Sequence, residues 1–144
     1  MGRFAYYSPL WLGALLVVLL NDTLRAALPP TWSETLRWLV VVGAALAAGV
    51  QSQVLMFGLQ GAFAQVLPVP IGRSIRGGGA AVTGWLLVSW VVLSGVTVLL
   101  AAEAVTQAAL GLGMLSLLTL AGAIAIYVWN LPTAVADFGT PAGE

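Results

Sequence analysis

Charged residues are absent from three long stretches of this chain, residues 38–72, 77–102 and 104–136. The 144 residues include five arginines, five aspartates and glutamates, and no lysine, so only 7% are charged. An average soluble domain is about 25% charged, and ten charges cannot cover a folded domain of this size with a polar surface. Hydrophobic residues make up 60% of the chain, which also excludes intrinsic disorder. The sequence therefore predicts an integral membrane protein.

Four apolar runs are long enough to form spanning helices, which need about 20 apolar residues each. We expect an all-α fold of four transmembrane helices in two hairpins, which places both termini on the same side of the membrane. The expected domain covers residues 1–132, and residues 133–144 form a mobile tail. The four helices are predicted at about residues 8–28, 32–66, 80–102 and 108–131.

Proline and glycine mark the helix ends. Pro29-Pro30 and Pro132 end the first and fourth helices, because proline cannot continue a helix. The segment 68–79 contains two prolines and four glycines, which predict a flexible connector between the two hairpins. At the start of the second helix, Thr31 and Glu34 have the spacing of a capping box. The first apolar run has an alternative interpretation as a secretory signal peptide, since Arg3 precedes a short apolar core.

Arginine and aromatic residues indicate the orientation. In the four-helix arrangement three arginines lie on the face of the termini and two on the opposite face, and this difference favours N-in/C-in. Trp and Tyr collect at membrane interfaces, and in this chain only Trp90 falls clearly inside a predicted span. The arginines of the first face are Arg3, Arg73 and Arg76, those of the second are Arg25 and Arg37, and the remaining interfacial aromatics include Trp32, Trp38, Trp85, Tyr127 and Trp129.

Most of the polarity inside the predicted spans belongs to glutamines of the second helix. Helical spacing places Gln53 and Gln60 on one face, and Gln51 and Gln65 on nearly the opposite one. A helix with polar residues on both faces is expected to contact protein on both sides, so this helix is predicted to be central in a bundle or an oligomer. Its amides either form interhelical hydrogen bonds or line a hydrated path or polar substrate site.

Two groups of charged residues are further candidates. Asp22, Arg25 and Glu103 are expected near one interface, where Arg25 would pair with Asp22 or Glu103 and tie the first helix to the second hairpin. The functional alternative for this cluster is an ion-entry vestibule or a proton-relay carboxylate. Arg73 and Arg76 lie in the connector, where they either contact a lipid phosphate or acidic partner, or only orient the chain by their charge.

The chain has no Cys and no His, which excludes thiol chemistry, Cys-based metal centres and the commonest general base. No cofactor, metal or nucleic-acid partner is expected, and the carboxylates Asp22, Glu34 and Glu103 make a poor case for an intramembrane enzyme. The expected partners are the lipid bilayer and other membrane-protein subunits or further copies of this chain. The predicted function is that of a non-catalytic accessory, scaffold or assembly subunit of a membrane complex. The alternative is a homo-oligomeric channel or small-solute transporter with the glutamines along its path.

Overall fold

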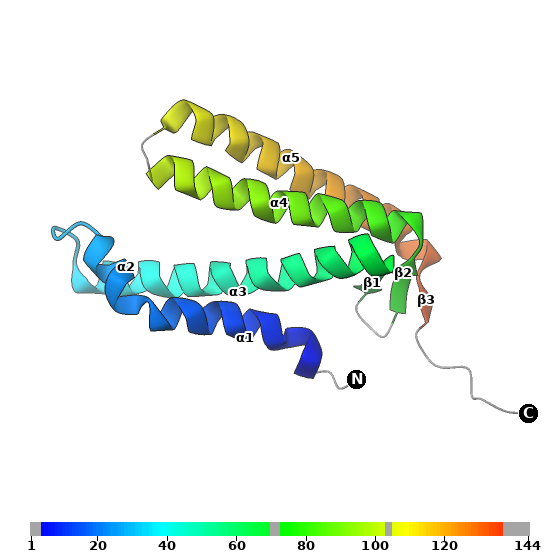
Figure 1. The fold of residues 1–144 in the computed structure, drawn as a ribbon, viewed down its shortest axis with the longest axis horizontal. Coiled ribbons are helices and arrows are strands. Elements are labelled where there is room, and N and C mark those ends of the chain that lie inside the picture. Colours follow the sequence, from blue (N-terminus) through cyan, green and yellow to red (C-terminus); the bar gives the residue numbers. More distant parts are fainter. Residues whose placement is uncertain (1–3, 70–72, 103–104, 137–144) are drawn as a thin grey trace, which may run out of the picture. The chain divides into compact units, whose positions relative to one another are not determined.

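The computed structural model describes residues 4–69, 73–102 and 105–136 (Figure 1). Within these residues the helices are α1 (Phe4–Leu19), α2 (Asn21–Ala27), α3 (Glu34–Ala64), α4 (Gly78–Ala102) and α5 (Thr106–Asn130). The shorter elements are β1 (Val66–Val69), β2 (Arg73–Arg76), the 3-10 turn η1 (Leu131–Thr133) and β3 (Val135–Ala136). The predicted helical class is confirmed, and a small sheet is added that the sequence did not predict.

Three helices of the described residues are long and apolar enough to cross a membrane, and they span Glu34–Ala64, Gly78–Ala101 and Thr106–Thr133. At ~1.5 Å per residue, α4 and α5 reach ~37 Å and α3 reaches ~46 Å. The hydrocarbon core is ~30 Å thick. Many of their large apolar side chains are exposed, and an apolar surface of this extent is one that lipid covers. The membrane class is therefore supported, with three of the four predicted spans.

The N-terminal segment is not the single helix that we predicted at residues 8–28. It begins at Phe4, and a turn at Leu20 (φ −91°, ψ 8°) divides it into α1 and the seven-residue α2. Directly after this turn, Asn21 Nδ2 donates to Asp22 Oδ1 at 3.2 Å. Asn and Asp favour helix ends and turns over helix interiors, which agrees with a break at this point. The 16 residues of α1 reach only ~24 Å, less than the thickness of the hydrocarbon core.

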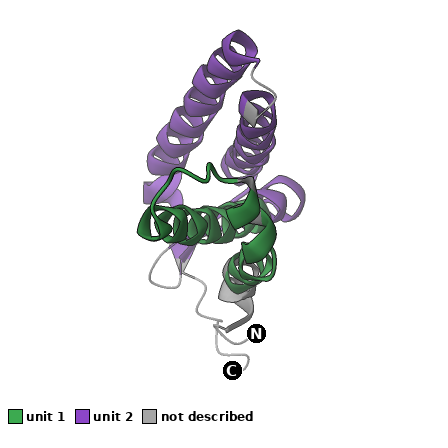
Figure 2. Ribbon diagram, turned by 90° about the vertical axis from the view of Figure 1, so that its left-hand side faces the viewer, with its two compact units in different colours: residues 1–56 green, residues 57–144 purple. Residues whose placement is uncertain are grey.

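The chain divides by its internal contacts into two compact units, residues 1–56 and 57–144 (Figure 2). In the first unit, α1 approaches the first part of α3 at Gly13. A Cβ atom at Gly13 would lie 2.6 Å from the carbonyl oxygen of Ala48 and 2.6 Å from Ser52 Oγ. The Ser52 hydroxyl donates to that same Ala48 carbonyl at 2.8 Å, so its polar group is satisfied within the contact. Only glycine permits helices to approach this closely.

Ser33, rather than Thr31, caps the start of α3. Its Oγ accepts a hydrogen bond from the backbone N–H of Leu36 at 3.3 Å, and its carbonyl accepts one from the N–H of Arg37 at 3.1 Å. The predicted capping box is therefore wrong by two residues, because Glu34 is the first residue of the helix and not its third. Glu34 still lies in the first turn, where a negative charge is favoured by the helix dipole.

In the second unit, the last turns of α3 cross the start of α4 through glycines of both helices. A Cβ atom at Gly84 would collide with the backbone nitrogen of Ala62 and would lie 2.6 Å from the carbonyl oxygen of Gly58. A Cβ at Gly61 would lie 2.8 Å from the carbonyl oxygen of Ala80. Small residues at such crossings allow two backbones to touch. Ala80 and Gly84, which are four residues apart on α4, therefore both contact α3 at this crossing.

The segment predicted as a flexible connector forms a β-hairpin instead. β1 pairs antiparallel with β2, with Leu67 opposite Ile75, and β2 pairs with β3, with Ser74 opposite Val135. Leu67 and Ile75 are buried in an apolar cluster with Ala80 and Ala134. Because β1 is an edge strand of this sheet, it tolerates the missing N–H of Pro68. The strand β3 lies in the segment predicted as a mobile tail, and residues 137–144 of that tail are outside the described residues.

Gln65 adopts a left-handed conformation, with φ at 53°, directly after the last residue of α3. Its carbonyl accepts a hydrogen bond from the N–H of Gly77 at 2.9 Å, which closes the base of the hairpin. This C-cap conformation is usually occupied by glycine, because a Cβ atom is strained there. Gln65 is therefore not part of a helical face, contrary to the prediction of a helix that extends to residue 66.

Candidate functional site

A groove of about 700 Å³ lies in the second unit between α4 and α5, which are side by side (Figure 1). From α4 the groove is lined by Trp90, Ser94, Thr97, Val98 and Ala101, and from α5 and its first turn by Thr106, Ala109, Leu110, Gly113, Met114, Ser116 and Leu117. Its wall is thus made of small residues and hydroxyl residues between larger apolar side chains. We call this surface the α4–α5 groove.

The spacing of small residues on α5 explains how the two helices come together. The buried residues of α5 are Ala109, Ser116 and Ala123, which follow one another at intervals of seven. A seven-residue repeat keeps one seam of a helix facing its neighbour. At the opposite end of the pair, a Cβ atom on Gly79 of α4 would lie 2.5 Å from Asn130 Oδ1 of α5. Small side chains along this seam leave room for the groove beside it.

The hydroxyl groups of α4 in the groove are bonded to their own helix. Ser94 Oγ donates to the carbonyl of Val91 at 2.9 Å, and Thr97 Oγ1 donates to the carbonyl of Leu93 at 2.8 Å. Such back-bonding satisfies a hydroxyl without water. The groove therefore has the properties of an apolar surface and suits an apolar occupant better than a column of water.

The four glutamine candidates are divided between the two units. Gln51 is half-buried and Gln53 is 7% exposed in the first unit, whereas Gln60 is half-buried in the second unit and Gln65 is exposed at the hairpin. Neither the α4–α5 groove nor the shallow hollow at Ala125, Val128, Trp129 and Pro132 has a glutamine in its wall.

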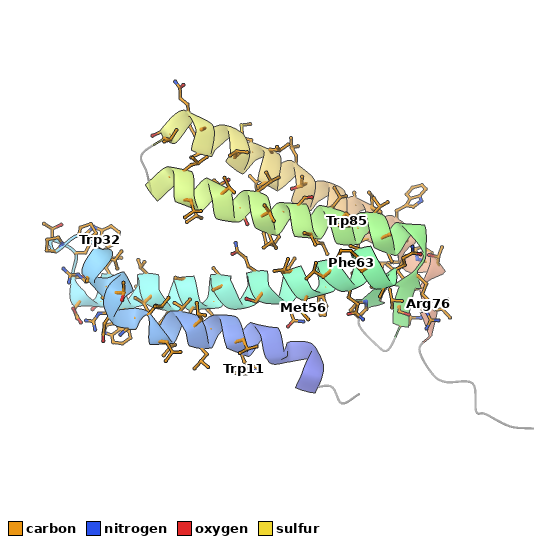
Figure 3. All side chains as sticks on the ribbon, in the orientation of Figure 1. Trp11, Trp32, Met56, Phe63, Arg76 and Trp85 are labelled. Atoms are coloured by element: carbon orange, nitrogen blue, oxygen red, sulfur yellow. The ribbon has the colours of Figure 1, made fainter. Side chains whose placement is uncertain are left out.

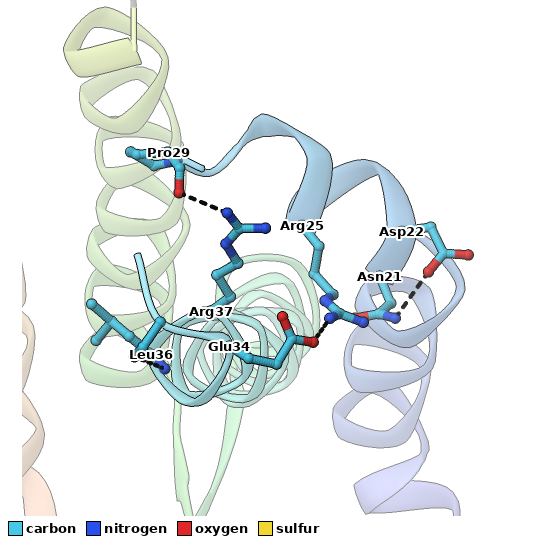
Figure 4. Close-up of polar contacts among 8 residues, drawn as sticks. Asn21, Asp22, Arg25, Pro29, Glu34, Leu36 and Arg37 are labelled. Atoms are coloured by element: carbon cyan, nitrogen blue, oxygen red, sulfur yellow. Dashed lines mark hydrogen bonds and ion pairs between the residues drawn. The ribbon is translucent and has the colours of Figure 1, made fainter. Parts of the chain in front are cut away.

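Arg25 pairs with a different carboxylate from the two that we expected. Its guanidinium forms an ion pair with Glu34 (Figure 4). The same guanidinium lies 4.8 Å from the ring centroid of Trp38. The turn at Pro29-Pro30 brings α2 back toward the first turn of α3, which explains why Glu34 is within reach. The expected partner Asp22 accepts instead from its neighbour Asn21, and the other expected partner, Glu103, lies outside the described residues.

This charged cluster joins α2 to α3 within the first unit. Arg37 adds a hydrogen bond from its guanidinium to the carbonyl of Pro29 at 3.1 Å (Figure 4). The Arg25 and Glu34 side chains are 26% and 63% exposed. Exposed ion pairs contribute at most about 1 kcal/mol. The cluster therefore holds the turn between α2 and α3 in place.

Arg73 and Arg76, predicted to lie in a flexible loop, are held on β2. Both side chains are exposed at the ends of the strand, and the two residues between them, Ser74 and Ile75, are buried. Arg76 Nε donates to Ser74 Oγ at 3.3 Å. The strand therefore fixes the positions of the two arginines, for which the sequence indicated only a shared loop.

Sequence reasoning missed the α4–α5 groove, although two signals pointed to it. One is Trp90, the tryptophan away from the predicted interfaces, and the other is the seven-residue spacing of Ala109, Ser116 and Ala123. No group of three or more His, Cys, Asp or Glu side chains that could hold a metal is found among the described residues. No protein-family model, curated protein or solved structure matches this chain.

Proposed function

We propose that this chain is a non-catalytic accessory or scaffold subunit of a larger membrane complex, and that its α4–α5 groove receives a transmembrane helix of a partner subunit. The observation that carries the proposal is the composition of the groove. The small residues Ala101, Ala109 and Gly113 leave space in the groove, and Ser and Thr side chains line it. Small and hydroxyl residues are the ones that interfaces between transmembrane helices use, whereas a surface that faces only lipid has no need of them.

A helix is favoured over a water-filled path for two reasons. The Ser94 and Thr97 hydroxyls are already bonded to backbone carbonyls, so the groove offers few polar groups to an aqueous solute. The side chain of Trp90 supplies a broad apolar wall that the ridge of another helix can pack against. The channel alternative would need the glutamines along one path, and it becomes one outcome of the experiment that follows.

Filling the groove should release the partner. In Gly113→Leu the added Cβ lies 3.5 Å from Thr97 Cγ2, an ordinary contact, so the chain can fold while its new side chain occupies the groove. We expect at least about tenfold less partner subunit to remain bound, because overpacking costs ~1–3 kcal/mol. The measurement is the ratio of partner to chain by native mass spectrometry after extraction in mild detergent.

The matched control is Gly111→Leu, because Gly111 is exposed on the same helix and a Cβ there meets nothing within 4 Å. It should keep the wild-type ratio of partner to chain. Retention of the partner by Gly113→Leu would contradict the proposed groove. A pure homo-oligomer that conducts ions or solutes in liposomes would replace the accessory function by the channel alternative.

The proposed architecture has a fourth crossing, formed by α1 and α2 together, and both termini on the inner side of the membrane. α1 and α2 together extend over residues 4–27, and a crossing needs about 20 residues. Because α3 and α4 join through the sheet, this crossing would complete two hairpins and a four-helix bundle. The arginine excess near the termini favours the inner side.

Single cysteines can test this arrangement because the wild-type chain has none. With a membrane-impermeant maleimide, we expect Gly2→Cys and Gly78→Cys to react only from the inner side, and Thr31→Cys and Gln107→Cys only from the outer side. Reaction of Gly2→Cys and Thr31→Cys from the same side would show that the N-terminal segment does not cross. Reaction of Gly78→Cys from the outer side would show that the orientation is opposite to the proposed one.

A further inference from the structure

We infer that the partner helix in the α4–α5 groove presents a carboxamide, the side chain of asparagine or glutamine, to Trp90 and Ser116 at the middle of the membrane. This inference rests on the proposed function, because it specifies which kind of helix that groove receives. Trp90 lines the groove from α4 and Ser116 lines it from α5. A helix that fills the groove therefore meets the polar groups of both residues.

Trp90 differs from other tryptophans of the chain in its depth. Trp32 lies before the start of α3, and Trp85 is exposed near the start of α4 (Figure 3). A tryptophan near a helix end is at the membrane interface, where its N–H can bond water or a headgroup. Trp90 is instead the middle residue of α4, at ~18 Å from either end of the helix.

Ser116 lies at a similar depth on α5. Because α5 follows α4 after a short connection and lies beside it, the two helices run antiparallel (Figure 1). Measured along the helix axes from the end of α4 and the start of α5, Trp90 is ~18 Å away and Ser116 is ~15 Å away. Both residues are therefore deep in a hydrocarbon core of ~30 Å.

Both residues have a polar group that no other described residue bonds. Ser116 is 4% exposed, and its carbonyl accepts from Thr119 Oγ1 at 2.7 Å, but its hydroxyl forms no hydrogen bond within the described part of the chain. The indole N–H of Trp90 likewise has no acceptor among the described residues. The Ser94 and Thr97 hydroxyls, by contrast, donate to carbonyls of their own helix. Since the hydrocarbon core contains no water, the occupant of the groove has to complete these bonds.

The hydrogen-bonding capacities of the two groups indicate a carboxamide. The Trp90 indole N–H only donates, whereas the Ser116 hydroxyl both donates and accepts. A carboxamide suits both, because its oxygen accepts and its NH₂ group donates. A carboxylate would also accept, but the residues that line the groove include no cation that would compensate its charge in the hydrocarbon core. A lipid chain has no acceptor, and a purely apolar helix has its backbone carbonyls bonded internally.

The experiment measures the preference of the whole protein, in micelles, for one of three synthetic transmembrane peptides. All have a leucine–alanine sequence flanked by lysines. The first has asparagine at its centre, the second has leucine there, and the third has its asparagine two turns from the centre. Native mass spectrometry gives the fraction of protein that holds one peptide. We expect wild type to bind the central-asparagine peptide about fivefold more tightly than the leucine peptide, as hydrogen bonds between transmembrane helices are of this strength. The third peptide should bind like the second.

Two conservative variants assign the preference to the two polar groups. Trp90→Phe removes the indole N–H and keeps an aromatic ring, and Ser116→Ala removes the hydroxyl between the buried residues Ala109 and Ala123. Each variant should lower the preference for asparagine to about twofold, and the double variant should abolish it. Ser89→Ala is the matched control, because Ser89 is exposed on α4 and lies outside the groove. It should keep the wild-type preference.

The outcomes separate this inference from the proposed function. Equal binding of the asparagine and leucine peptides, with both lost in Gly113→Leu, would overturn the carboxamide and leave the groove as a site for a helix. If wild type binds neither peptide, the inference and the groove function both fail. The inference is also overturned if the double variant keeps the preference, if Ser89→Ala removes it, or if Gly113→Leu still binds the asparagine peptide as wild type does.

Discussion

Replacing Gly84 by alanine should lower the free energy of unfolding of the second unit by about 3 kcal/mol, at the upper end of overpacking effects. The added methyl group would meet the backbone nitrogen of Ala62 and lie 2.6 Å from the carbonyl oxygen of Gly58. Both of these neighbours are backbone atoms of α3, so neither can move aside by a change of rotamer. The two helices would have to separate, and the contacts on both sides of the crossing would be lost.

The measurement is thermal unfolding in detergent, followed by circular dichroism at 222 nm. Gly95→Ala is the matched control, since Gly95 lies on the same helix and a Cβ there meets nothing within 4 Å. It should leave the stability unchanged or raise it by up to about 1 kcal/mol, because alanine favours the helix more than glycine does. Equal effects of the two substitutions would mean that the α3–α4 crossing is not closely packed at Gly84.

Replacing Ile75 by alanine should open the sheet. Ile75 is opposite Leu67 and is buried in the cluster with Ala80 and Ala134, so the substitution removes buried methyl groups and leaves a cavity. Large-to-small substitutions in a core cost ~2–5 kcal/mol. The α4 and α5 helices should remain, so the loss is expected to be local to the hairpin.

Hydrogen exchange of the peptide that covers residues 66–77 provides the measurement. We expect its amides to exchange about 100-fold faster in Ile75→Ala, which corresponds to a local loss of ~3 kcal/mol. Val135→Ala is the control within the same sheet, because Val135 is 56% exposed and little buried surface is lost. If exchange in Ile75→Ala stays at the wild-type rate, the apolar cluster does not hold the sheet together.

The sequence predicted the helices best where apolar runs end at strong signals. The predicted helix at 108–131 starts two residues after α5 does and ends one residue beyond it. The predicted helix at 80–102 starts two residues after α4 does and ends at the same residue. The break at Leu20 was missed because the apolar run continues across it and only Asn21 and Asp22 mark the change.

The sheet could not be read from local patterns, and the two sequence signals of the groove did not give its width. Pro68 and Gly77 are ordinary loop residues, and their place in or beside a hairpin depends on the burial of Leu67 and Ile75, which is a tertiary contact. The groove depends on the distance between α4 and α5. Arg25 lies near a turn between helices. Its partner, Glu34, depends on the path of the chain through Pro29, which the spacing of residues along one helix cannot show.

The order of the strands has a consequence for how the protein is made. β1 and β2 are neighbours in the sequence and can pair as soon as both have been synthesised, whereas β3 follows the last helix. Until Val135 arrives opposite Ser74, the outer edge of β2 has unpaired backbone groups, which favour wrong pairing. A chain cut after α5 would keep α3, α4 and α5 and still have this open edge. Closure of the sheet therefore has to wait until both α5 and β3 have been synthesised.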